Sequence, residues 1–205
     1  MFKFFVPLLS PTRSGVSGIA TLLRRAKFSS IQKAPVEVPP DKMCSLKDSA
    51  VTNRYELMFA TKEGLPIRRF PISHSAIAWH SPEQDHFVVY GRQSPYDPTK
   101  WLGKSLWSLQ TRMDNEHSYL NKGFTFTAHP TGVTFSREEM ERCLHLADEK
   151  INKTQFCNMI TSNCYSYSST VMALAVQQLL GRPKLDAEGI SQILTVMAKH
   201  PLSDH

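Results

Sequence analysis

Hydrophobic periodicity changes once along this chain, and that change most constrains its fold. Short segments that alternate apolar and polar residues occupy the first part, and helical spacing takes over from Thr134-Phe135-Ser136 onward. Strands and helices in separate runs are typical of an α+β domain. The chain of 205 residues has room for one such domain and a terminal extension. We therefore expect a small antiparallel sheet packed against helices.

The strands are predicted from local patterns. The segments with strand character lie at residues 55–60, 75–79, 86–90 and 124–127. The second and third of them are the arms of a hairpin, because Ser81-Pro82-Glu83-Gln84-Asp85 between them is a clear turn sequence. Residues 94–123 are rich in Pro, Gly, Asn and Asp and are expected to be irregular.

Three helices are predicted after the strands. The first begins at Ser136, which forms a capping-box pattern with Glu139. Its apolar stripe consists of Met140, Cys143, Leu144 and Ala147. The second helix runs from about residue 164 to 180, and the third spans roughly residues 186–199.

Basic charge is concentrated at the N-terminus. Six basic and no acidic residues precede Pro35, and they account for the whole formal net charge of +6. A nucleic-acid-binding domain would carry its basic residues on the folded body, so no nucleic-acid partner is expected.

Composition also divides the chain into segments. Residues 1–34 have the basic, acid-free composition of a mitochondrial transit peptide, and the alternatives are a disordered basic extension and a peripheral membrane-binding segment. Residues 35–52, which contain three prolines, are interpreted as a linker. Residues 53–200 are the predicted folded domain.

The cysteines match neither a disulfide framework nor a zinc site. No two of Cys44, Cys143, Cys157 and Cys164 form a CxxC pair. Reduced thiols in an intracellular compartment are therefore expected, with no metal and no cofactor. The sequence has no run of about 18 apolar residues, so no transmembrane helix is predicted.

One of these cysteines stands where a nucleophile works best. Cys164 follows the polar residues Thr161-Ser162-Asn163 and opens a long predicted helix. Unpaired N–H groups and the helix dipole lower the pKa of a thiol at such a position. The same N–H groups can bind the oxyanion that forms at an attacked carbonyl. The ordinary alternative is a small buried hydrophobic residue without reactivity.

A cysteine nucleophile needs a base within hydrogen-bond reach, and His74 is the candidate. It stands at the start of a predicted strand, from which its ring could project toward a helix N-terminus; a purely structural histidine is the alternative. Gln93 and His86 are candidates for a third residue that orients the imidazole. Asn163 is a candidate for supporting the oxyanion.

The order of these motifs resembles that of the PPPDE family, the desumoylating-isopeptidase-like thiol proteases. The resemblance covers roughly residues 54–195. Three stretches carry it: residues 55–65 resemble the first strand and its Lys/Gly turn, Ser73-His74-Ser75-Ala76-Ile77 resembles the His-Thr-Gly/Ser-Ile/Val block, and Asn163-Cys164-Tyr165-Ser166-Tyr167-Ser168 resembles Asn-Cys-Asn-x-Phe-Ser.

The resemblance implies a circularly permuted papain fold in which the histidine precedes the cysteine. It places Cys164 at the position of the nucleophile and His74 at that of the catalytic histidine. The implied activity is hydrolysis of isopeptide bonds to ubiquitin-like modifiers or of S-acyl thioesters on proteins. The departures are Tyr165 for Asn, Tyr167 for Phe, Ser75 for Thr, and the lack of a Gly-rich loop in the middle segment.

Two alternative functions stay open. A lipid acyltransferase or phospholipase of the lecithin retinol acyltransferase-like type would use the same cysteine and histidine, and the basic N-terminal segment would suit a membrane substrate. His86 follows His74 by 12 residues, the spacing of the paired histidines in those relatives. The other alternative is a catalytically inactive binding module with the same fold.

Overall fold

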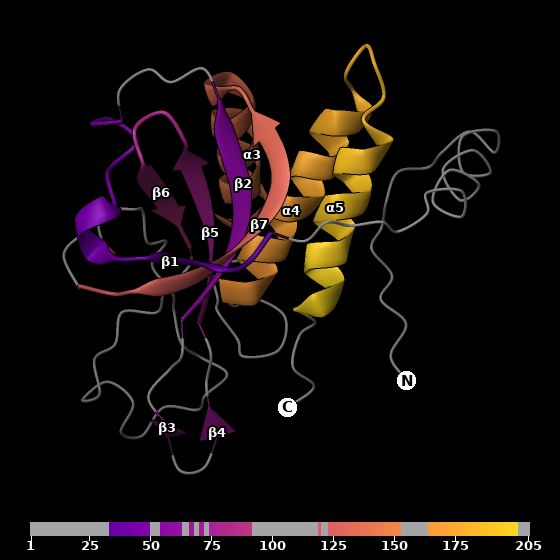
Figure 1. Cartoon of the computed structure of the whole chain (residues 1–205). Helices are drawn as coiled ribbons and strands as arrows, with labels where there is room; N and C mark the ends of the chain where they lie inside the picture. Colours follow the sequence, from indigo (N-terminus) through magenta and orange to yellow (C-terminus); the bar gives the residue numbers. More distant parts are fainter. Residues whose placement is uncertain are drawn as a thin grey trace.

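The computed structural model describes residues 33–49, 54–62, 66–67, 70–71, 74–91, 119, 123–152 and 164–200. These residues form an α+β fold, a curled five-stranded antiparallel sheet with three α-helices, which confirms the predicted class (Figure 1). The strands are β1 (Val36–Val38), β2 (Tyr55–Lys62), β3 (Pro66–Ile67), β4 (Phe70–Pro71), β5 (His74–Ser81), β6 (His86–Tyr90) and β7 (Phe126–Phe135). Their order in the main sheet is β1-β7-β2-β5-β6, and β3 pairs only with β4.

The predicted hairpin is present at one edge of this sheet. Strands β5 and β6 pair from Ile77↔Tyr90 to Ser81↔His86, and the turn between them contains Asp85 in a left-handed conformation with φ 49°. Aspartate tolerates this conformation better than most residues because its short polar side chain can hydrogen-bond locally.

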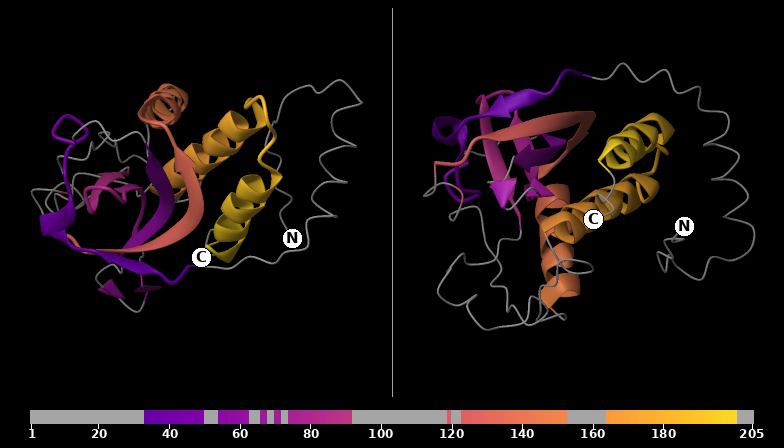
Figure 2. Two further views of the ribbon diagram at one scale, coloured as in Figure 1. Left: turned by 45° about the horizontal axis from the view of Figure 1, so that its top comes forward. Right: turned by 90° about the horizontal axis from the view of Figure 1, so that it is seen from below.

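Strand β7 is longer than the short strand that was predicted near residues 124–127. Pro130 and Gly132 are unfavourable inside strands, so the sequence suggests an early end. The strand nevertheless continues to Phe135, because its register with β2 shifts between Glu56 and Met58. Such an irregularity accommodates the two residues and bends the strand, and Figure 2 shows β7 curving around the end of the sheet.

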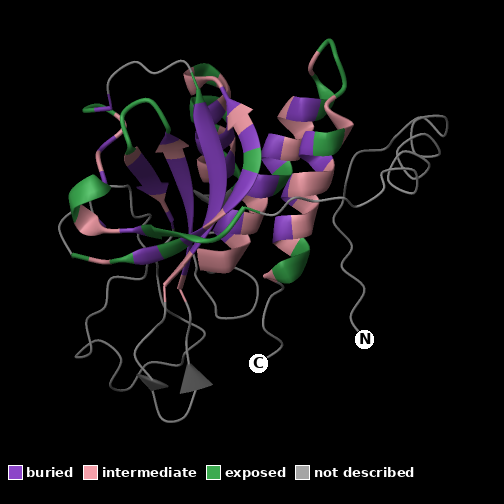
Figure 3. Ribbon diagram, viewed as in Figure 1, coloured by how far each residue is buried: buried purple, intermediate pink, exposed green. Residues whose placement is uncertain are grey.

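Both faces of the central strands are buried, as Figure 3 shows. Alternate residues of β2 and β5, such as Leu57 and Trp79, pack in the cluster that faces the helices. The intervening residues, such as Met58 and Ala76, belong to a second cluster. The curl of the sheet encloses this second cluster, to which Val38 of β1 and Phe126 of β7 also contribute.

The three predicted helices are confirmed as α3 (Arg137–Asn152), α4 (Cys164–Leu180) and α5 (Ala187–Lys199). The capping box at the start of α3 is formed in both directions: Ser136 N donates to Glu139 Oε2 at 2.9 Å, and Glu139 N donates to Ser136 Oγ at 3.2 Å. The apolar stripe predicted for this helix is buried. No helix in the described part of the chain is both long and apolar enough to cross a membrane.

Residues 36–49 are part of the folded body, so the prediction of a linker at 35–52 is wrong for them. Strand β1 pairs with β7, Val38 is fully buried, and Met43 forms a parallel bridge with Phe87. Between them, η1 (Pro40–Lys42) is a single 3-10 turn. The prolines suggested a linker, but they flank a strand that is only three residues long, which is too short for alternation to be recognised.

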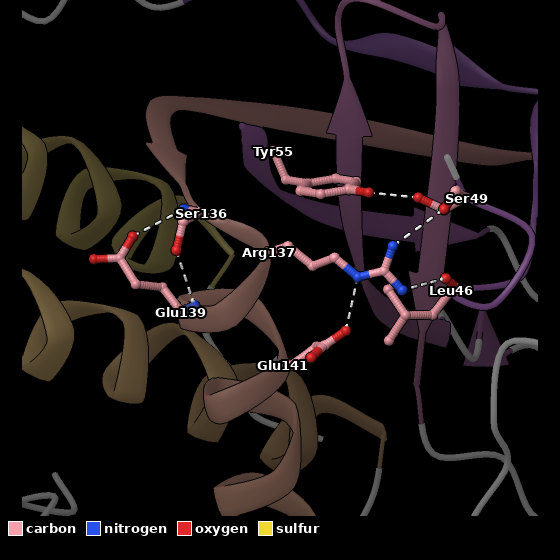
Figure 4. A network of polar contacts seen from close by, with 7 residues as sticks. All are labelled: Leu46, Ser49, Tyr55, Ser136, Arg137, Glu139 and Glu141. Carbon is pink, nitrogen blue, oxygen red and sulfur yellow. Dashed lines mark hydrogen bonds and ion pairs between the residues drawn. The ribbon is translucent and has the colours of Figure 1, made fainter. Parts of the chain in front are cut away.

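The segment after this turn is held against helix α3 by one guanidinium (Figure 4). Arg137 donates to Leu46 O at 2.9 Å, to Ser49 O at 3.1 Å and to the carboxylate of Glu141 at 2.8 Å. The hydroxyl groups of Ser49 and Tyr55 also hydrogen-bond to each other. The contacts of Arg137 give hydrogen-bond donors to two partly buried backbone carbonyls that lie outside the strands.

Candidate active site

Cys164 is the first residue of α4, and the burial of that helix fixes its position. Tyr167, Val171 and Ala175 recur at helical spacing and are fully buried in the core cluster beneath the helix. The side of the helix N-terminus that carries Cys164 therefore faces the start of β5. Cys164 forms no disulfide, and the residue as a whole is half-buried.

His74 is the first residue of β5, and it lies in hydrogen-bond contact with Cys164 although ninety positions separate the two. Burial of the thiol opposes its ionisation. The hydrogen bond and the charge of His74, together with hydrogen bonds from Ser75, outweigh that effect and lower the pKa of Cys164 from 9.0 to about 7. A substantial fraction of the thiol is therefore ionised at neutral pH.

Ser75 contributes two separate donors to the sulfur, its backbone N–H and its hydroxyl. The side chain is buried, with 4% of its surface exposed. Ser168, one turn along α4, donates to the Cys164 carbonyl at 3.1 Å, and its hydroxyl lies 3.5 Å from that of Ser75. These two hydroxyl groups tie the start of β5 to the first turn of α4, which holds the thiol in place.

Tyr119 contacts the other side of the imidazole, and sequence reasoning missed it. Its hydroxyl lies 2.9 Å from His74 Nε2, and its ring is fully buried against Phe126 in an edge-to-face arrangement at 5.2 Å. Gly91 leaves room for it, because a Cβ at that position would clash with the hydroxyl of Tyr119. Tyr119 lies in the stretch predicted to be irregular, where no local pattern marks it.

The structure places His86 far from the pair formed by Cys164 and His74, referred to below as the dyad. His86 pairs with Ser81 at the far end of β5, seven residues from His74 and therefore roughly 20 Å along the strand. The prediction of His86 as the third residue is therefore wrong. Strand β6 begins after the turn that follows Ser81, so His86 lies at the end of β5 that is far from His74. Gln93 and Asn163 lie outside the described residues.

A cluster of aromatic rings lies next to Cys164 on the α5 side. Tyr165 contacts Phe59 edge to face at 5.9 Å, and its hydroxyl donates to the carbonyl of His200 just after α5. The ring of His200 stacks on Phe59 at 5.1 Å and lies 4.0 Å from the ring of His129. Burial, first of all, lowers the pKa of both histidines, and nearby positive charge, that of Lys199 included, lowers it further.

The arrangement around Cys164 places a thiol of lowered pKa next to an imidazole, with a tyrosine hydroxyl at the Nε2 of that imidazole. Within the described ranges, no group of three or more His, Cys, Asp or Glu side chains is arranged to bind a metal ion. What the described side chains can perform is nucleophilic attack by a thiolate followed by proton transfer through an imidazole.

Comparisons with protein-family models, with curated protein sequences and with solved structures found no match to this chain. The geometry of Cys164, His74 and their neighbours, together with the motifs in the sequence, is what indicates a function.

Proposed function

We propose that this protein is a thiol hydrolase in which Cys164 is the nucleophile and His74 the general base. The observation that carries the proposal is the contact between these two side chains at the N-terminus of a long helix, with the pKa of the thiol lowered to about 7. A cysteine buried for structural reasons alone behaves differently. The pKa of Cys143, on the buried face of α3, is raised to about 12, chiefly by burial.

The proposed reaction has two halves. The thiolate of Cys164 attacks the carbonyl carbon of an amide, isopeptide or thioester bond, and backbone N–H groups at the start of α4 stabilise the oxyanion. The carbonyl re-forms as the bond to the leaving group breaks, and the His74 imidazolium gives its proton to the leaving amine or thiolate. In the second half His74 takes a proton from water, whose oxygen attacks the acyl-enzyme, and the thiol of Cys164 is released.

We further propose a circularly permuted papain-like fold and a protein substrate. A histidine at the start of a strand that precedes a cysteine at a helix N-terminus is the arrangement implied by the resemblance to the desumoylating-isopeptidase-like proteases. The substrate class is accordingly a conjugate of a ubiquitin-like modifier or an S-acylated protein. The residues that would recognise it are not carried over from the family, because the segment between β6 and β7 departs from its pattern.

The two alternative functions have less support. The lipid acyltransferase reading depended in part on His86, which lies at the far end of β5 from the dyad. A catalytically inactive module would not need a histidine in contact with a cysteine of lowered pKa. No described contact favours either alternative over hydrolysis.

The test measures hydrolysis of two probes, a ubiquitin-like protein with a fluorogenic C-terminal amide and an S-acyl peptide thioester. We expect Cys164→Ala and His74→Ala each to lower the rate by roughly 1,000-fold or more on whichever probe is cleaved. Cys44→Ala, which removes the thiol of another half-buried cysteine, is the matched control and should retain the rate. Equal activity of Cys164→Ala and the unsubstituted protein would exclude the mechanism.

A further inference from the structure

We infer that Tyr119 is a positioning residue that completes the site as a Cys164–His74–Tyr119 triad. The inference rests on the proposed function, because a positioning role has meaning only if His74 acts as a base. Three observations carry it: the contact of the hydroxyl with His74 Nε2, the burial of the tyrosine ring, and the space that Gly91 leaves for the hydroxyl.

The first observation assigns the two ring nitrogens of His74. Nε2 lies 2.9 Å from the Tyr119 hydroxyl, and we therefore assign the hydrogen bond with the sulfur of Cys164 to Nδ1. For Nδ1 to accept the thiol proton, a neutral imidazole must carry its own hydrogen on Nε2. The hydrogen bond made by one ring nitrogen decides the protonation of the other. The Tyr119 hydroxyl can accept such a hydrogen bond, and the inference assigns Nε2–H as the donor, which is the tautomer that can act as a base.

The same contact persists when His74 takes up the proton. Imidazolium carries hydrogen on both nitrogens, so Nε2–H still donates to the phenol oxygen while Nδ1–H donates to the thiolate. Hydrogen bonds in which one partner is charged are the stronger ones. The tyrosine thus stabilises the ion pair more than the neutral pair, and it does so without contact with the substrate.

The burial of the Tyr119 ring and the space beside Gly91 restrict the position of the Tyr119 hydroxyl. The ring of Tyr119 is fully buried and lies edge to face on Phe126 of β7, which is also near the ring of His74 at 6.3 Å. On the other side, Gly91 directly follows β6, and any side chain there would displace the phenol oxygen. Residues from three different parts of the chain therefore fix a single hydroxyl group against Nε2.

Two substitutions test this hydrogen bond by different means. Tyr119→Phe removes only the oxygen, whereas Gly91→Ala keeps the oxygen and displaces it from its position against His74. The matched control is Tyr167→Phe, which also removes a buried phenol oxygen, but one that contacts Asp148 instead of the dyad. Circular dichroism and thermal unfolding confirm that each variant is folded.

The main measurement is the rate of alkylation of Cys164 by iodoacetamide against pH, with the labelled peptide identified by mass spectrometry. The unsubstituted protein should show a midpoint near pH 7, as follows from the pKa of its thiol. Tyr119→Phe and Gly91→Ala should both shift the midpoint to higher pH and lower the rate at pH 6.5 by roughly tenfold. Tyr167→Phe should change neither quantity.

A second readout does not depend on reactivity. The nitrogen-15 chemical shifts of His74 at pH 8 should report hydrogen on Nε2 in the unsubstituted protein and a mixture of tautomers in Tyr119→Phe. Superimposable alkylation profiles and nitrogen shifts for these two proteins would overturn the role of Tyr119 while leaving the dyad intact. A midpoint near that of an ordinary cysteine, unchanged by His74→Ala, would instead overturn the proposed function itself.

Discussion

Two opposing effects act on the thiol of Cys164. Its burial disfavours the thiolate, whereas His74 and the two donors of Ser75 favour it, and the balance gives a pKa of about 7. A thiol of that pKa is largely ionised just above neutral pH and still retains much of the nucleophilicity that more acidic thiols lose. The groups around the sulfur atom of Cys164 thus determine both the pH range in which the thiolate forms and the nucleophilicity of that thiolate.

Replacement of Ser75 with alanine tests the contribution of its hydroxyl to this balance. The variant keeps the burial, the His74 contact and the Ser75 N–H, so the pKa of Cys164 should rise only in part, by roughly half to one pH unit. Alkylation of the thiol should therefore slow between pH 6 and 8, where less thiolate is present, and equal the unsubstituted rate at high pH. Ser81→Ala on the same strand, equally buried and remote from the dyad, should show the unsubstituted profile. A Ser75→Ala profile that matches it would contradict this assignment.

At the scale of elements, helix α3 does more than cover the sheet. Its first residue, Arg137, binds two backbone carbonyls of the segment between η1 and β2. These are charge-assisted hydrogen bonds, which are stronger than hydrogen bonds between neutral groups. The helix therefore holds in place a segment that its sequence alone would leave as a linker.

Arg137→Ala should destabilise the fold by about 1–3 kcal/mol, because it leaves the carbonyls of Leu46 and Ser49 without these donors. Urea unfolding followed by circular dichroism measures this loss. Arg142→Ala removes an exposed arginine from the same helix and is the matched control. Equal unfolding midpoints for the two variants would show that the segment does not depend on Arg137.

The contact between β7 and the end of α5 should make stability depend on pH. Burial holds the pKa of His129 and of His200 below the unfolded value, so between the folded and unfolded pKa values the unfolded chain binds more protons. Stability contributed by this pair is therefore present above about pH 6.5 and is lost as the pH falls.

His129→Phe keeps an aromatic ring on β7 and removes one titrating group. Its melting temperature should fall less between pH 7.5 and pH 5 than that of the unsubstituted protein. An unchanged fall in His129→Phe would show that the ring pair contributes nothing to acid sensitivity.

Across the whole molecule, the N-terminal boundary of the fold lies earlier than composition suggests. The folded body includes residues 36–49 through the pairing of β1 with β7 and the burial of Val38 and Met43. The basic segment before it, residues 1–34, stays a predicted targeting or membrane-binding extension. Its last residues reach the fold through the ion pair of Lys33 with Glu56, 2.8 Å long.

Two truncated chains locate this boundary. A chain that starts at residue 33 keeps β1 and the bridge to Phe87, whereas a chain that starts at residue 44 loses both. We expect the shorter chain to melt several degrees lower, because it exposes buried apolar surface and leaves the edge of β7 unpaired. Differential scanning calorimetry of the two chains makes the comparison. Identical melting temperatures would contradict this expectation and would support the interpretation of residues 35–43 as a linker.

The sequence by itself determined the elements whose cause is local. The β5–β6 hairpin follows from its turn residues, the start of α3 from the Ser136–Glu139 capping box, and the three helices from apolar spacing. It also singled out Cys164 and His74, because a thiol at a helix N-terminus and a histidine at a strand end are local patterns of recognisable chemistry.

Only the tertiary structure decided how distant residues meet. It brought Cys164 and His74 into contact, set Tyr119 against Nε2 in the space beside Gly91, and separated His86 from both. It also drew residues 36–49 into the sheet. Each of these outcomes depends on register and packing between segments far apart along the chain, and no local pattern of residues encodes such distances.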